Sequence, residues 1–158
     1  MPEVREVPRE APLRILVVED EVLIALELEC LLEDLGHVSV GVAGCSADAI
    51  ALGRTAQPDV ALVDIHLIDG PTGVEVARQL SQDPRVTVVF MTANAKRIPP
   101  DFAGALGVIA KPYSERAVAG ALDYVAQRRA GHPPSAETLD GFHLAPEPGG
   151  GDRTGGQP

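Results

Sequence analysis

Polar side chains that could do chemistry follow four of the apolar runs in this sequence. They are three carboxylates, a hydroxyl and an ammonium group: Glu19, Asp20, Asp64, Thr92 and Lys111. Carboxylates suit a divalent cation, and a hydroxyl or an ammonium group can bind a negatively charged centre. We predict that Asp64 is the reactive group and that the other four supply the cation site, the hydroxyl and the positive charge that it needs.

The run before Asp64 is apolar and β-branched, which is typical of a strand buried on both faces. An ionised carboxylate at the end of such a strand is unfavourable unless a neighbouring group compensates its charge. In open α/β sheets, the carboxyl ends of the strands are also where ligands bind. The alternative is that Asp64 only forms the turn that leads to Gly70 and Gly73, because Asp is common in turns.

Composition limits the classes of function. The chain has 158 residues, enough for one domain with a sizeable core, and 45% of its residues are hydrophobic. Its net charge of -10 argues against nucleic acid as a partner. No apolar run reaches the roughly 18 residues of a membrane span, and residues 1–12 do not resemble a signal peptide. We therefore expect a cytoplasmic protein, with Cys30 and Cys45 as buried free thiols.

Apolar runs alternate with helical patterns, which predicts an α/β fold with a doubly wound parallel sheet. The predicted strands are 13–18, 38–43, 60–63, 86–91 and 107–110. The predicted helices are 22–35, 46–55, 74–83 and 114–129. The connection over 95–106 contains Pro99, Pro100 and Gly104, so only a short or irregular fourth helix fits there. We expect this connection to be the least ordered part of the domain.

The chain is predicted to divide into three segments. These are a flexible lead-in over 1–12, a folded domain over 13–129 and a disordered tail over 130–158. In the tail, 12 of the last 29 residues are Gly or Pro, a composition typical of flexible segments. An alternative function for part of the tail, residues 139–144, is that of a docking peptide.

The helix predicted over 22–35 has more apolar surface than one core contact requires. Four residues at helical spacing are expected to face the sheet: Ile24, Leu28, Leu31 and Leu35. Three more apolar residues lie on adjoining faces: Val22, Leu23 and Leu26. They either widen the core stripe or, together with Tyr113, form a docking surface for a partner.

The motifs VVEDE, VDIHL, FMTAN and AKPY together resemble the receiver domain of two-component response regulators, in the CheY-like superfamily. The resemblance covers residues 13–129. It implies a flavodoxin-like (βα)5 fold with sheet order 2-1-3-4-5 and a ligand pocket at the point where the strand order reverses. It also implies a signalling protein that accepts a phosphoryl group and later loses it, and not a turnover enzyme.

The resemblance also implies a role for each polar residue. Asp64 would accept the phosphoryl group from the phosphohistidine of a sensor histidine kinase, Thr92 would hydrogen-bond it and Lys111 would pair with it. Mg²⁺ would be held by Asp20, Asp64, the backbone carbonyl of His66 and, through water, Glu19. A cation is needed because the carboxylates and the phosphoryl oxygens are all negative, and Mg²⁺ prefers oxygen ligands of this kind.

Further features of the family map onto this sequence. The Lys111–Pro112 bond would be cis, and His66 and Asn94 would tune the rate of phosphoryl loss. Val108 stands where receivers usually have a switch aromatic residue. The run Phe90-Met91-Thr92-Ala93 is similar to atypical receivers that stand alone and pair with HWE-type kinases. In such a receiver, order or disorder over 95–106 would carry the signal.

Several functions remain open from the sequence. The receiver could switch the binding of an unidentified downstream protein, act as a phosphate sink, or serve as a scaffold without phosphorylation. An aspartyl-phosphate phosphatase is a less favoured alternative, because His66 stands where such an enzyme needs a second catalytic Asp. We expect no nucleic acid or membrane partner, and a monomer or a phosphorylation-dependent homodimer.

Overall fold

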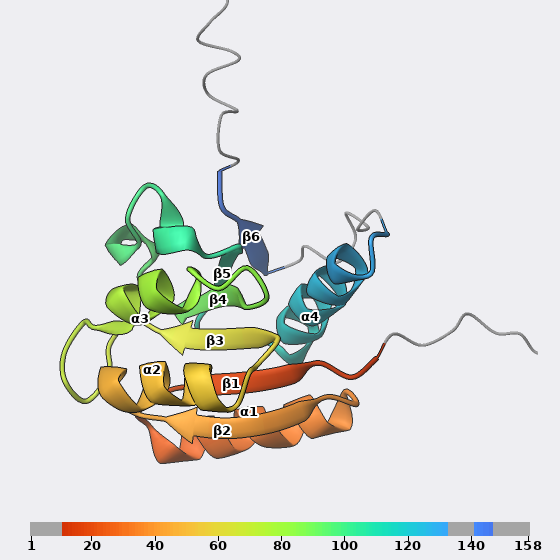
Figure 1. The fold of residues 1–158 in the computed structure, drawn as a ribbon, viewed down its shortest axis with the longest axis horizontal. Helices are drawn as coiled ribbons and strands as arrows, with labels where there is room; N and C mark the ends of the chain where they lie inside the picture. The colour runs from red at the N-terminus through yellow and green to blue at the C-terminus, as the bar shows by residue number, and fades with distance from the viewer. Residues whose placement is uncertain (1–10, 133–140, 147–158) are drawn as a thin grey trace, which may run out of the picture.

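The computed structural model describes residues 11–132 and 141–146, which together form one six-stranded sheet with helices on both faces (Figure 1). The strand order is β2-β1-β3-β4-β5-β6. The pairs from β2 to β5 are parallel, whereas β6 pairs antiparallel with β5. The predicted α/β class and the order 2-1-3-4-5 are confirmed. Residues 1–10 of the predicted flexible lead-in and most of the predicted tail lie outside the described residues.

The predicted elements follow one another in the expected order, with bounds that differ from the prediction by at most three residues, and β6 is an additional strand. The strands are β1 (Arg14–Val18), β2 (Val38–Ala43), β3 (Val60–Asp64), β4 (Thr87–Thr92), β5 (Gly107–Ala110) and β6 (Phe142–Leu144). The helices are α1 (Val22–Asp34), α2 (Ser46–Thr55), α3 (Gly73–Leu80) and α4 (Glu115–Arg129). Two short 3-10 helices, η1 (Ala95–Arg97) and η2 (Phe102–Gly104), connect β4 to β5.

Two apolar cores lie on opposite faces of the sheet. One joins α1 and α4 to the sheet, and the other joins α2 and α3 to it. The register aligns the carboxyl ends of the strands, with Val18 opposite Val63, and Asp64 opposite Met91. The polar residues that follow these strands therefore lie together at the end of the sheet where the carboxyl ends of its parallel strands meet.

The prediction for the buried face of α1 is partly wrong. Its buried residues are Ala25, Leu28, Leu31 and Leu32, whereas Ile24 and Leu35 are only half-buried. The apolar residues cover more than one face, so their spacing alone could not fix the rotation of the helix about its axis. Val22, Leu23 and Leu26 remain exposed and do not widen the core stripe.

The connection over 95–106 has no regular helix, as predicted. Ile98, Ala103 and Ala105 are nevertheless buried in the core beside α3. The Ser81 hydroxyl donates to the carbonyl of Ala103 at 3.2 Å. The segment is therefore attached to α3 at several points, and the expectation that it is the least ordered part of the domain stays a prediction.

The prediction of a tail without structure over 130–158 is wrong for residues 141–146. This segment contains β6, and Phe142 is 1% exposed in the core that joins α1 and α4 to the sheet. One aromatic residue among many Gly and Pro residues gives no periodic pattern, which explains why the strand was missed.

Two expectations from composition can also be compared with the structure. Cys30 is exposed and Cys45 is half-buried, so both are free thiols but the predicted burial is wrong. Among the described residues, no helix combines the length and the apolar character that crossing a lipid bilayer requires.

Candidate functional site

Three carboxylates meet at the carboxyl ends of β1 and β3. Glu19 and Asp20 follow β1 directly, and Asp64 is the last residue of β3. One oxygen atom from each of the three lies within 4.8 Å of the others. Glu19 is 5% exposed, and Asp20 and Asp64 are half-buried. Three acidic groups so close together require a compensating positive charge.

Lys111 supplies part of that charge. It follows β5, and its Nζ donates to Oε1 of Glu19 at 2.9 Å and to Oδ2 of Asp64 at 3.1 Å. The Lys111 side chain is 17% exposed, so water screens these ion pairs only weakly. The Lys111–Pro112 peptide bond is cis. The predicted lysine therefore lies at the acidic cluster and bridges two of its carboxylates.

Burial and hydrogen bonding oppose each other in setting the pKa values of Glu19 and Lys111, and a different effect is larger for each residue. Burial raises the pKa of Glu19 above its ordinary value, and the hydrogen bonds from Lys111 and from the Glu21 amide oppose this only in part. Burial lowers the pKa of the Lys111 ammonium, but the hydrogen bonds and charges of Glu19 and Asp64 outweigh burial and raise it. The site therefore holds a charged lysine beside a carboxylate whose charge is costly to bury.

Thr92 ends β4 and is 5% exposed. Its hydroxyl oxygen accepts a hydrogen bond from the Asn94 amide at 3.1 Å. Asn94 is exposed, and its side-chain oxygen accepts from the Lys96 amide at 3.2 Å. Thr92 thus lies at the same sheet edge as the acids, and Asn94 lies at its solvent-exposed border.

The loop between β3 and α3 is held in place by a carboxylate that sequence reasoning missed. The Ser46 hydroxyl donates to Asp69 at 2.5 Å, and the Thr72 hydroxyl donates to it at 2.7 Å. These hydrogen bonds lower the pKa of Asp69. The Ile68 amide also donates to the carbonyl of Gly44 at 3.0 Å. The loop is therefore tied to the start of α2, and His66 is exposed within it.

Gly73 is a second residue that was missed, although it packs against the site. A Cβ atom at this position would lie 2.0 Å from the backbone oxygen of Asp64 and 2.6 Å from Cα of Ile65. The start of α3 therefore approaches the end of β3 as closely as its backbone allows. A glycine at the first position of a helix, where it is not a typical cap, is the signal that could have found it.

The predicted docking residues lie beside the acids on the surface. Val22, Leu23 and Leu26, on the first turns of α1, are 70%, 75% and 51% exposed. Ile68, in the tied loop, is 74% exposed, and its Cδ1 lies against Gly44 near Asp20. Tyr113 is half-buried; burial raises the pKa of its hydroxyl, and the negative charge of Glu27 on α1 adds to this effect. We define the docking patch as the predicted α1 residues Val22, Leu23 and Leu26 together with Ile68, which the sequence did not indicate, and the predicted docking role of Tyr113 stays a prediction.

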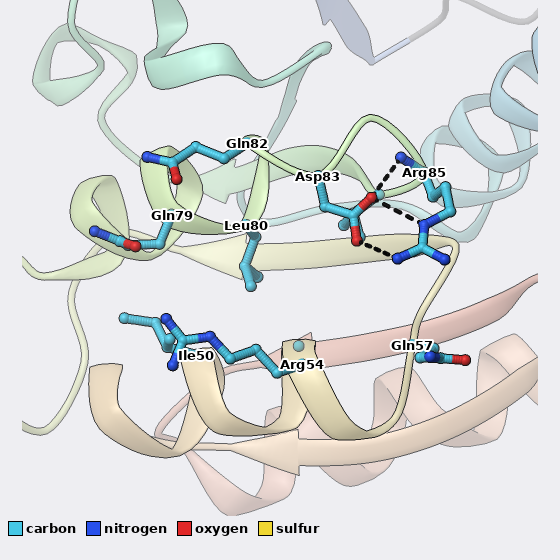
Figure 2. Close-up of a pocket in the computed structure, with 10 residues that line it drawn as sticks. Ile50, Arg54, Gln57, Gln79, Leu80, Gln82, Asp83 and Arg85 are labelled. Carbon is cyan, nitrogen blue, oxygen red and sulfur yellow. Dashed lines mark hydrogen bonds and ion pairs between the residues drawn. The ribbon is translucent and has the colours of Figure 1, made fainter.

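A separate hollow of about 390 Å³ lies between α2 and the connection from α3 to β4 (Figure 2). Its lining residues are Ile50, Gly53, Arg54, Gln57, Gln79, Leu80, Gln82, Asp83, Arg85 and Val86. Gln57 and Val86 precede β3 and β4, so the hollow lies at the amino ends of the strands. It is therefore at the opposite end of the sheet from the acidic cluster.

The acidic cluster fits a magnesium ion by its chemistry. Its donor atoms are all carboxylate oxygens, which Mg²⁺ prefers. Lys111 binds Oδ2 of Asp64 but leaves Oδ1 without a hydrogen bond among the residues that the structure describes, and the Asp20 carboxylate is likewise unbonded. These oxygens are the ones that a divalent cation would use.

Comparison with known proteins gives one family match and several similar proteins. Residues 15–123 match the family described as response regulator receiver domain. A curated relative, the phyllosphere-induced regulator PhyR of Methylorubrum extorquens, is 33% identical in an alignment of 141 positions that covers 81% of this chain and 51% of the relative.

Two solved structures are also similar. A mutant of the anti-anti-sigma factor PhyR from Bartonella quintana has a TM-score of 0.68 and 26% identity, covering 78% of this chain and 52% of that one. The receiver domain of PhyR from Erythrobacter litoralis has a TM-score of 0.65 and 28% identity, covering 73% and 90%. The chain spans about half the length of the curated relatives that it matches.

Proposed function

Since the chain belongs to the response regulator receiver domain family, we propose that it accepts a phosphoryl group on Asp64 from a sensor histidine kinase and thereby changes its binding to a protein partner. The observation that carries this proposal is the Lys111 ammonium held between Glu19 and Asp64 at the carboxyl ends of the strands. Receiver domains are regulators and not turnover enzymes, which agrees with the prediction from sequence.

In the proposed reaction, a carboxylate oxygen of Asp64 attacks the phosphorus of a phosphohistidine. A P–O bond forms as the P–N bond breaks, and the imidazole nitrogen keeps the electron pair of that bond. The product is an acyl phosphate, which water later hydrolyses to the free carboxylate and inorganic phosphate. Lys111 is close enough to pair with the new phosphoryl oxygens, and the Thr92 hydroxyl would donate to one of them.

Magnesium would be held by Asp20, Asp64, the His66 carbonyl and, through water, Glu19. When bound, it would lower the repulsion between these carboxylates and the incoming phosphoryl group. His66 and Asn94 border the site and are proposed to control the access of the hydrolytic water. Both are exposed, which supports a role at the border and not in the centre of the site.

A small phosphoryl donor tests the reaction without a cognate kinase. Phosphoramidate contains a P–N bond, as phosphohistidine does, and intact-protein mass spectrometry counts the phosphoryl groups added. We expect one group on the wild-type chain with Mg²⁺, and none on Asp64→Asn. Asp48→Asn, an exposed carboxylate on α2, is the matched control and should be labelled like the wild type. Equal labelling of Asp64→Asn would contradict the proposal.

The docking patch is proposed to contact the kinase. It is apolar and exposed beside the acids, so a partner that delivers a phosphoryl group to Asp64 would cover it. Leu26→Asp should slow transfer from a phosphorylated kinase but leave labelling by phosphoramidate unchanged, because the small donor needs no docking. Val38→Asp, exposed on β2, is the control. An unchanged rate of phosphoryl transfer from the kinase to Leu26→Asp would exclude the docking patch as a contact surface for the kinase.

The partner that responds to phosphorylation is proposed to be another protein. The Bartonella quintana relative is described as an anti-anti-sigma factor, which supports regulation through protein binding. The net charge of -10 also makes nucleic acid an unfavourable direct target.

A further inference from the structure

The edge of β5 is covered by a short strand from the end of the chain (Figure 1). Gly107, Val108 and Ile109 pair with Leu144, His143 and Phe142 in an antiparallel ladder. The ladder continues beyond β6, since the Ala145 amide donates to the carbonyl of Leu106 at 2.8 Å. Without this segment, β5 would present an open edge to solvent.

Phe142 anchors the segment in the core. Its ring meets Tyr124 of α4 edge to face, with 5.8 Å between the ring centroids. A Cβ atom at Gly107 would lie 2.5 Å from the carbonyl oxygen of His143 and 2.8 Å from the Phe142 ring. Gly107 thus makes the space that this close approach needs.

Gly141 allows the chain to turn into β6. Its φ is +79°, and a Cβ atom there would lie 2.7 Å from Cβ of Ala117 on α4. A glycine is therefore required immediately before the aromatic anchor. The fit of residues 141–146 to β5 and α4 therefore depends on a glycine at two positions, Gly107 in β5 and Gly141 before β6.

The other side chains of residues 141–146 contribute little to this fit. His143 and Leu144 are exposed, and within the described part of the chain no side chain of the segment forms a hydrogen bond or an ion pair. Main-chain hydrogen bonds of a ladder form with almost any sequence. Binding to the edge of β5 therefore requires only an extended segment in which a glycine is followed by an aromatic residue.

We propose that the edge of β5 is a strand-docking surface, which residues 141–146 occupy as an intramolecular ligand. An extended segment of a partner protein, with a glycine before an aromatic residue, would bind there by displacing β6. Adding a strand to a sheet edge is a general mode of peptide recognition, in which the ladder gives affinity and a side-chain pocket gives specificity. The proposal does not depend on phosphorylation of Asp64.

A peptide with the sequence of residues 141–146, labelled with a fluorophore, tests the surface in the chain of 158 residues. Phe142→Ala should weaken the hold of β6 and open the pocket, so it should bind the peptide at least tenfold more tightly than the wild type does. Leu144→Ala, which alters an exposed side chain of the same strand, should bind like the wild type. A peptide with Ala in place of Phe should bind to neither. Equal anisotropy titrations for wild type and Phe142→Ala would overturn the proposal.

A measurement on the wild-type chain avoids the case in which Phe142→Ala does not fold. With excess unlabelled peptide, the amide NMR signals of residues 106–109 and 141–146 should shift in a saturable way while the rest of the spectrum is unchanged. Signals that stay unchanged at millimolar peptide would show that β6 is a fixed part of the sheet and would overturn the proposal. A concentration-dependent dimer of the wild-type chain would do the same, because a second copy would then be the occupant.

Discussion

Replacing Lys111 with Met removes the charge that bridges two carboxylates and keeps most of the apolar stem. Two charge-assisted hydrogen bonds are lost, at 2.9 and 3.1 Å, and each such bond contributes about 1.5–3 kcal/mol. Part of that loss is offset because the buried ammonium no longer has to be desolvated. We therefore expect Lys111→Met to lower the free energy of unfolding by about 3 kcal/mol at pH 8, near the lower limit for breaking a buried ion pair.

The effect should depend on pH in a defined direction. The pKa of Lys111 is raised in the folded state, so its contribution is fully present below the unfolded pKa and is lost as the pH rises through the folded value. The pKa of Glu19 is also raised, so Glu19 takes up a proton early as the pH falls, and one of the two ion pairs then disappears. The difference between wild type and Lys111→Met should be largest between pH 7 and pH 9 and smaller at pH 4.5.

Urea unfolding followed by circular dichroism at pH 4.5 and pH 8 measures this difference. The chain has one other lysine, Lys96, which is exposed. Lys96→Met is therefore the matched control, and it should change the free energy of unfolding by less than about 0.5 kcal/mol. If Lys111→Met were as stable as Lys96→Met at pH 8, the argument that Lys111 stabilises a buried acidic cluster would be refuted.

Three further predictions concern the same site. Glu19→Gln should raise the urea midpoint at pH 8 and weaken Mg²⁺ binding measured by calorimetry. The pKa of Glu19 is raised in the folded state, so the stability associated with Glu19 is lost as the pH rises through that folded-state pKa. A lower urea midpoint for Glu19→Gln would contradict this. Gly73→Ala should destabilise the domain by about 1–3 kcal/mol in urea and reduce labelling by phosphoramidate, because its Cβ would meet the backbone of Asp64; wild-type labelling would show that α3 adjusts without disturbing the site. Beryllofluoride, a phosphoryl mimic at Asp64, should slow hydrogen exchange over 95–106, and unchanged protection there would exclude this segment as the signal.

The parallel α/β sheet and the grouping of polar residues at the carboxyl ends of its strands could be predicted because each piece of information was local, whereas the order of the strands came from the resemblance to receiver domains. A polar residue after a β-branched apolar run marks the carboxyl end of a strand, and parallel strands place these ends together. Asp64, Glu19 and Lys111 could therefore be grouped before any coordinates were known. The direct contact between Lys111 and Glu19 could not be predicted, since it depends on side-chain conformations across 92 residues of sequence.

Other features depend on distant partners and left no local pattern. Phe142 is one aromatic residue in a Gly-rich and Pro-rich segment, and its place in the core exists only because Gly107 has no side chain. The rotation of α1 is a second case, because its apolar residues allow two buried faces and only packing against the sheet selects Ala25 and Leu32. The role of Asp69 is a third, since its partner Ser46 lies at the start of α2, 23 residues away in the sequence.

The site and the edge covered by β6 share one four-residue strand. Lys111 follows β5 directly, and its amide donates to the carbonyl of Thr92 at 2.9 Å, which fixes the end of β5 to the end of β4. Phosphorylation would replace one carboxylate charge on Asp64 with a doubly charged phosphoryl group, so Lys111 would have to share its hydrogen bonds differently. Phe142 pairs with Ile109, two residues before Lys111. A shift of Lys111 would therefore reach β6 through two residues of β5 and the ladder between Ile109 and Phe142. If Asp64 is phosphorylated as proposed, β5 is the strand that would carry the change to residues 141–146, with Val108 in place of a switch aromatic residue.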